Sequence, residues 1–151
     1  MKTAVFANSK GGVGKSTIAL LTSLSLARKY NRANVELIDL DPQATRSDSL
    51  PRFANYRFKV INNEEFYLGS TTPNNSRIIS HLESSSDNHI SECYSVIDCP
   101  AGNDPVRSTF LLHSDIIFIP TSVSDADVFA TKKYIASLID LFESDVENSP
   151  K

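Results

Sequence analysis

The sequence predicts one α/β domain built around a doubly wound, mostly parallel β-sheet. Its 151 residues are the usual length of a single domain and are enough to bury a core. Short apolar runs alternate along the chain with stretches of helical periodicity. The runs lack the apolar–polar alternation of a half-exposed strand, so we expect strands buried on both faces, as in a parallel sheet.

The composition is that of a globular protein. Hydrophobic residues make up 40% of the chain and charged residues 22%, which excludes wholesale disorder and fibrous repeats. The net charge of −3 provides no overall basic field for nucleic acid or anionic lipid. No apolar run approaches the roughly 18 residues of a membrane span, and no secretory leader precedes the first strand. Cys93 and Cys99 lack metal or redox spacing, so we expect reduced thiols and a cytoplasmic protein.

The first predicted elements are a strand, a glycine-rich turn and a helix. The apolar run 3–7 is typical of a buried strand, and the helix is predicted over 15–29. This helix ends in Arg28 and Lys29, where cations suit the last turn. Its apolar residues at helical spacing are Ile18, Leu20, Leu21, Leu24 and Ala27. A second strand is predicted over 35–38.

The middle of the chain is less regular. Residues 43–56 are polar and compatible with a short helix broken by a proline. A third strand is predicted over 58–61, and a loop over 62–76 because this stretch is rich in Asn, Ser, Thr, Gly and Pro. A weak helix over 77–83 is followed by a predicted turn at 84–88.

The last predicted elements are two strands and a long helix. The strands cover 94–97 and 116–119, and the helix covers 126–143. We therefore expect one domain over 1–143 and a flexible tail over 144–151. In a doubly wound sheet, ligands bind beyond the carboxyl ends of the strands, and several of these strands end at an aspartate or at glycines.

A glycine-rich, lysine-containing loop lies between the first strand and the first helix. Its glycines let the backbone curl so that successive N–H groups point inward and hold an anion, and the helix beginning at Lys15 adds its positive end. Lys15 would reach the β- and γ-phosphates of ATP, and the Ser16 hydroxyl would bind Mg²⁺. The predicted nucleotide-binding residues are Lys10, Gly11, Gly12, Val13, Gly14, Lys15, Ser16 and Thr17.

This loop carries a second lysine. The general P-loop pattern has glycine where this chain has Ser9, and Lys10 follows it. Lys10 cannot easily fold onto its own γ-phosphate, because Lys15 and the surrounding amides already occupy that position. The motif KGGVGKST resembles the deviant P-loop of the ParA/MinD family of ATPases. This resemblance implies a P-loop NTPase fold and a catalytic Lys10 that completes the partner's site in an ATP-sandwich homodimer.

Two carboxylates follow the second strand. Asp39 and Asp41 are two residues apart, so both point the same way while the chain stays extended. One could hold a water of the Mg²⁺ shell while the other orients the attacking water. The block IDLDPQAT resembles the partition-ATPase motif. The resemblance implies that Asp41 is the catalytic, water-activating residue. It also implies that Asp39 supports the metal without binding it directly.

Another carboxylate ends the strand predicted over 94–97. Asp98 resembles the Walker B acid, which with Ser16 would hold Mg²⁺. Residues 99–104, here called the switch loop, resemble the loop that senses the γ-phosphate. Cys99 in this loop is not thereby a nucleophile.

The resemblance extends to residues 119–130, which are similar to the strand–loop–helix of small plasmid ParA proteins. In this block we interpret Asp127 as a helix-start carboxylate of local value. The three histidines have polar neighbours and are interpreted as surface residues; they are His81, His89 and His113.

The resemblance runs from residue 1 to about 142 and is closest to the small plasmid-partition ParA proteins. The family fold continues with at least one more strand–helix unit, so we expect this chain to lack the last units. Those units usually supply the adenine pocket and the basic surface that binds DNA. Whether DNA is a partner of this chain is therefore left open. The resemblance also implies a protein that stimulates hydrolysis and association with the nucleoid. Because the missing units carry the membrane-binding helix in MinD, we expect no membrane partner.

The leading functional prediction is a Mg²⁺-dependent ATPase that dimerises on ATP and hydrolyses it slowly to drive plasmid or DNA partitioning. One alternative is a nucleotide-sensing or inactive, truncated ParA-like module. Another is a ParA-like switch in conjugation or cargo positioning. Bacterial tyrosine kinases have similar motifs but need a tyrosine-rich tail, which does not follow Tyr134. Small-molecule kinases and synthetases of this fold lack a residue equivalent to Lys10.

Overall fold

A parallel sheet forms the centre of the protein. The computed structural model describes all residues except 31–32, 43–57, 68, 87–91 and 149–151. Among the described residues, five strands pair in parallel in the order β3-β2-β4-β1-β5. The strands are β1 (Lys2–Phe6), β2 (Asn34–Asp39), β3 (Phe58–Ile61), β4 (Cys93–Asp98) and β5 (Ile116–Phe118). The predicted α/β class with a parallel sheet is confirmed.

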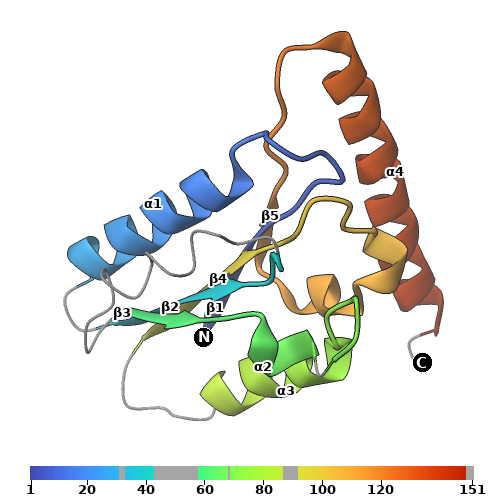
Figure 1. The fold of residues 1–151 in the computed structure, drawn as a ribbon. Helices are drawn as coiled ribbons and strands as arrows, with labels where there is room; N and C mark the ends of the chain where they lie inside the picture. Colours follow the sequence, from blue (N-terminus) through green and yellow to red (C-terminus); the bar gives the residue numbers. More distant parts are fainter. Residues whose placement is uncertain (31–32, 43–57, 68, 87–91, 149–151) are drawn as a thin grey trace.

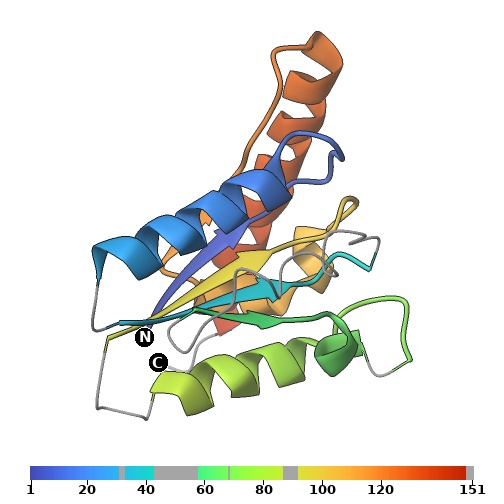
Figure 2. The same ribbon diagram turned by 60° about the vertical axis from the view of Figure 1, so that its left-hand side comes forward.

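Helices cover both faces of this sheet. Figure 2 shows α1 on one face and α2 and α3 on the other. The long helix α4 begins above the carboxyl end of the sheet and runs back down beside it (Figure 1). The helices are α1 (Lys15–Lys29), α2 (Glu64–Tyr67), α3 (Asn75–Ser86), α4 (Asp125–Asn148) and two 3-10 helices, η2 (Pro105–Arg107) and η3 (Thr109–His113). None of the described helices combines the length and apolar character needed to cross a membrane.

The strand side chains alternate between two hydrophobic clusters. Val35 and Leu37 of β2 lie in the cluster under α1, whereas Ile38 belongs to the cluster on the opposite face. On α1 the small residues Ala19 and Ser23 are buried, whereas Ile18 and Leu21 are exposed. Small side chains let the helix approach the sheet closely, so the larger residues flank the contact rather than forming it.

Three other boundaries differ from the predictions. A short helix, α2, interrupts the predicted loop because Phe66 and Tyr67 bury their side chains there. Helix α3 starts earlier than predicted, after Asn74, whose side chain accepts a hydrogen bond from the N–H of Arg77. Helix α4 continues to Asn148, so part of the predicted tail is helical. The short helix considered for 43–56 lies outside the described residues.

His81 is not the surface residue that the sequence indicates. Its Nε2 lies 3.0 and 3.1 Å from the two carboxylate oxygens of Glu36 on β2, and its ring packs edge-on against Phe66. Ser95 of β4 donates a further hydrogen bond to Glu36. These contacts attach α3 to the sheet through a charged group. His113 is exposed as predicted, and His89 lies outside the described residues.

This contact predicts a pH-dependent stability. The hydrogen bond that His81 donates to the Glu36 carboxylate raises the pKa of His81 above its ordinary 6.5. The extra stability is therefore fully present below pH 6.5 and is lost as the pH rises through the folded-state pKa. We expect His81→Gln to remove this pH dependence of the free energy of unfolding, which amounts to about 1–2 kcal/mol. Urea unfolding measured across that pH window checks this. His113→Gln is the control and should keep the wild-type slope; equal slopes in both variants would contradict the assignment.

Candidate functional site

The glycine-rich loop between β1 and α1 curls as its sequence predicts. Gly12 and Gly14 have φ angles of 74° and 90°, a left-handed region that other residues rarely adopt. Gly14 directly precedes α1, so the chain turns into the helix at this point. The amino end of α1 is thereby placed at the carboxyl end of the sheet, where its positive dipole favours an anion.

Lys15 folds back over this loop. Its side chain is buried, at 6% exposed, and its Nζ donates to the Lys10 carbonyl oxygen at 2.7 Å. Burial lowers the pKa of Lys15, while the nearby Asp98 acts in the opposite direction. Because a carbonyl rather than a carboxylate holds the ammonium group, this group can exchange its partner for phosphate oxygens at low cost.

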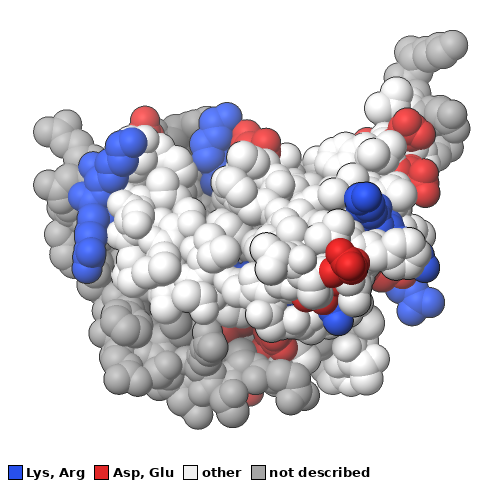
Figure 3. Space-filling model, turned by 90° about the horizontal axis from the view of Figure 1, so that it is seen from above, with Lys and Arg blue, Asp and Glu red and all other residues white. Residues whose placement is uncertain are grey.

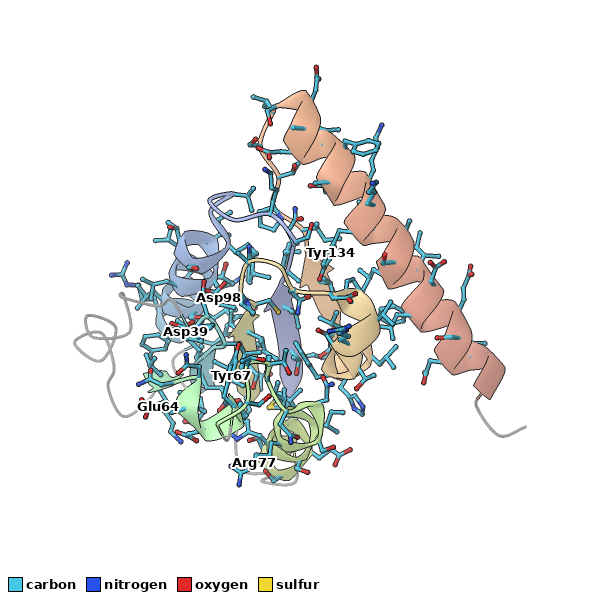
Figure 4. All side chains as sticks on the ribbon, turned by 45° about the vertical axis from the view of Figure 1, so that its right-hand side comes forward. Asp39, Glu64, Tyr67, Arg77, Asp98 and Tyr134 are labelled. Atoms are coloured by element: carbon cyan, nitrogen blue, oxygen red, sulfur yellow. The ribbon has the colours of Figure 1, made fainter. Side chains whose placement is uncertain are left out.

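Two buried aspartates lie side by side at the ends of neighbouring strands. Asp39 of β2 is in register with Asp98 of β4, and Figure 4 shows both at the same edge of the sheet. Burial raises the pKa of both carboxyls, and that of Asp98 reaches about 7. A hydrogen bond from Ser16 opposes this rise at Asp98, whereas the charge of Asp39 adds to it. The predicted metal-binding residues are therefore brought together.

Asp98 has an unused oxygen that suits a cation. Its Oδ1 is buried and has no hydrogen-bond partner among the described residues. Such an orphaned acceptor is costly unless a further group binds it, and Mg²⁺ prefers oxygen ligands. At this site, as in the rest of the described part of the chain, no three His, Cys, Asp or Glu side chains gather as metal ligands. Mg²⁺ sites of this sparse kind rely on phosphate and water for the remaining ligands, so Ser16 and Asp98 fit this ion.

Asp41 lies just beyond β2. Its backbone N–H donates to Asp39 Oδ1 at 3.0 Å, and its carbonyl oxygen accepts from Asn63 Nδ2 at 3.3 Å. The neighbouring Leu40 carbonyl accepts the hydroxyl of Tyr67 at 2.8 Å. Burial raises the pKa of this tyrosine to about 12, so the hydroxyl stays a donor. The sequence had indicated no role for Tyr67, which stabilises the strand end that carries both aspartates.

The switch loop packs directly on the glycine-rich loop. The N–H of Gly102 donates to the Ser9 carbonyl at 2.8 Å. A β-carbon at Gly11 would lie 3.4 Å from the Ala101 β-carbon, so the two loops approach closely at this glycine. Cys99 is buried, and burial raises the pKa of its thiol, which agrees with the expectation that it is not a nucleophile.

Lys10 points away from the other predicted residues and reaches α4. Its Nζ lies 3.1 Å from Asp127 Oδ1, and Ser122 also donates to this carboxylate. Asp127 lies in the first turn of α4 as the sequence predicts, and it also forms an ion pair with Lys10. Asn8 makes a second connection, because its Nδ2 donates to Thr131 Oγ1 at 2.9 Å. Neither contact has a sequence signal, since the partners are remote along the chain.

The surface around this site carries few charges. Seen from above, its described part shows a largely uncharged middle with small, separate groups of acidic and basic side chains around it (Figure 3). The attraction for an anion in this region therefore comes from the loop amides, the α1 end and the two lysines rather than from a broad basic field.

These features define the class of the protein. A parallel sheet, a curled glycine-rich loop after its first strand and a lysine folded over that loop are the features of a P-loop nucleotide-binding protein. A family model described as ATPase MipZ matches residues 2–134. The chain therefore belongs to the ParA/MinD family of deviant Walker A ATPases, whose members bind and hydrolyse ATP.

Individual proteins are similar to this chain in sequence or in fold. The chain is 29% identical, over 99% of its length, to the maintenance of carboxysome distribution protein A of Halothiobacillus neapolitanus, and spans 62% of that protein. A plasmid partition protein of Borrelia burgdorferi bound to AMPPNP superposes with a TM-score of 0.67 at 20% identity, over 93% of this chain and 70% of that one. The cobyrinic acid a,c-diamide synthase of Mycobacterium smegmatis, solved with ADP and magnesium, superposes with a TM-score of 0.60 at 18% identity. This superposition covers 95% of this chain and 69% of the synthase.

Proposed function

We propose that this chain is a Mg²⁺-dependent ATPase that binds ATP, dimerises around two nucleotides and hydrolyses them slowly to position DNA or another cargo. The observation that carries this proposal is the buried group at the carboxyl end of the sheet. Lys15 lies over the curled loop, and Asp98, which is hydrogen-bonded by Ser16, has one oxygen without a partner among the described residues. This group offers a cation for phosphate and two oxygens for Mg²⁺.

Each residue of the group has a distinct part in the proposal. Backbone amides of residues 10–17 hold the phosphates, and Lys15 neutralises charge on the transferring phosphoryl group. Ser16 and Asp98 would hold Mg²⁺, which would supply Lewis-acid stabilisation of that charge. Asp41 orients the attacking water, with Asp39 beside it. Hydrolysis is slow because an aspartate is a weak base near neutral pH.

The cargo and partners belong to this proposal as well. The likeness to proteins named for carboxysome distribution and for plasmid partition supports a role in positioning a large intracellular object. Plasmid or other DNA is the cargo we propose, with a second protein that stimulates hydrolysis. A cytoplasmic location follows from such a role. The dimer would bring Lys10 of one copy to the nucleotide of the other.

Calorimetry with ATP and Mg²⁺, followed by phosphate release, tests the proposal. We expect the wild-type protein to bind ATP and turn it over, and Lys15→Ala to weaken binding roughly a hundredfold through loss of charge-assisted hydrogen bonds. Lys29→Ala, at the far end of α1, is the matched control and should bind normally. Folded wild-type protein that ignores millimolar ATP would refute nucleotide binding. Binding without turnover would refute the ATPase and favour the nucleotide-sensing alternative.

A further inference from the structure

One side of α4 contacts both loops of the nucleotide site. Asp127, Thr131 and Tyr134 follow one another at helical spacing, so they share a face of the helix. The first two contact the glycine-rich loop at Lys10 and Asn8. Tyr134 contacts the switch loop instead, and Figure 4 shows it on the side of α4 that faces the body of the protein.

The contact of Tyr134 is a buried hydrogen bond to Asn103. The tyrosine hydroxyl donates to Asn103 Oδ1 at 2.7 Å, and the Asn103 Nδ2 in turn donates to Ser108 Oγ at 2.8 Å. Tyr134 is 3% exposed and Asn103 7%. Both ends of the Asn103 amide are therefore occupied, which determines the direction of this side chain.

Asn103 is the neighbour of the residue that joins the two loops. Gly102 precedes it and donates its N–H to the Ser9 carbonyl, immediately before Lys10. The same stretch includes Ala101, which lies against Gly11. Any rotation of the backbone at Asn103 therefore changes how the switch loop lies on the phosphate-binding loop.

The side of the switch loop that faces α4 borders a hollow in the surface. An open surface hollow of about 290 Å³ lies between Ser9, the switch loop and α4. Its lining includes Gly102, Asn103, Lys133 and Tyr134. Both partners of the Tyr134–Asn103 hydrogen bond therefore lie at the edge of this hollow, and the bond itself is buried.

We propose that Tyr134 is a positioning residue for ATP hydrolysis, holding the switch loop against the phosphate-binding loop through Asn103. This proposal rests on the proposed ATPase function. It goes beyond it by assigning a role to α4, which contains none of the predicted catalytic residues. The tyrosine acts through Asn103 and Gly102 and does not itself touch the nucleotide. Because burial also raises the pKa of Tyr134, its hydroxyl remains a donor across the pH range of the assay.

Tyr134→Phe removes this hydrogen bond and leaves the ring in place. We expect kcat to fall about fivefold, as for the loss of one buried hydrogen bond, while the Kd for ATP changes less than twofold. Hydrogen exchange followed by mass spectrometry should show faster exchange over 99–104, with exchange in β1 and β4 unchanged. In an Asn103→Ala background, Tyr134→Phe should have no further effect on kcat.

Tyr94→Phe is the matched control, because its hydroxyl donates to Glu92 at 3.4 Å near the start of β4, away from Asp98. It should leave kcat and loop exchange at wild-type values. Wild-type kcat and wild-type exchange in Tyr134→Phe would overturn the positioning role while the ATPase stands. Faster exchange throughout the sheet would also overturn it, because the tyrosine would then stabilise the whole fold. A wild-type protein without turnover would overturn the ATPase itself, and the positioning role with it.

Discussion

Asp98→Asn is expected to stabilise the nucleotide-free protein. Burial is the main reason that the pKa of Asp98 rises from 3.8 to about 7. A raised carboxyl pKa means that ionisation is costlier in the folded chain, so the penalty grows between pH 3.8 and about 7 and is complete above that. Asparagine never ionises. Urea unfolding at pH 8 should show a gain of about 2–4 kcal/mol that disappears near pH 4.

The same substitution is expected to remove the benefit of Mg²⁺ for ATP binding. Asparagine offers the cation a neutral oxygen in place of a charged one, so the Kd for ATP should become nearly independent of Mg²⁺. Titrations with and without Mg²⁺ measure this directly. Asp140→Asn, on the exposed side of α4, is the control for both effects. A destabilised Asp98→Asn protein that still responds to Mg²⁺ would contradict the metal site.

Loss of the ATP-dependent dimer is the expected result of removing Lys10. Asp41→Ala should block hydrolysis and let a dimer accumulate with ATP and Mg²⁺ in gel filtration. Adding Lys10→Ala should return this protein to the monomer, because the ammonium group that crosses to the partner's nucleotide is gone. A dimer that persists in the double variant would contradict the cross-subunit role.

Asp127 offers a second test of the same role. In the free chain Lys10 is paired with Asp127, and this pair must open before Lys10 can reach another subunit. Asp127→Ala in the Asp41→Ala background should therefore strengthen the dimer roughly threefold, as befits a partly exposed ion pair. Asp125→Ala, at the first residue of α4, is the matched control. A weaker dimer in Asp127→Ala would show that the carboxylate supports the dimer instead of competing with it.

Much of the site could be predicted because its signals are contiguous. The glycines within the loop from Lys10 to Thr17 determine its backbone conformation, and the structure shows the expected curl there. Asp39 and Asp98 each follow an apolar run, and parallel strands bring such positions to one edge. Their convergence follows from periodicity and strand direction, without knowledge of any remote contact.

The amino-acid sequence by itself thus determined the parallel α/β fold, the curl of the glycine-rich loop and the acids at the ends of neighbouring strands, because each depends on neighbours along the chain. The tertiary structure alone decided that Lys10 meets Asp127, that Tyr134 holds Asn103 and that His81 meets Glu36. Each of these pairs joins residues from different elements. Their meeting depends on how α3 and α4 pack against the sheet, and no local pattern of residues encodes that packing.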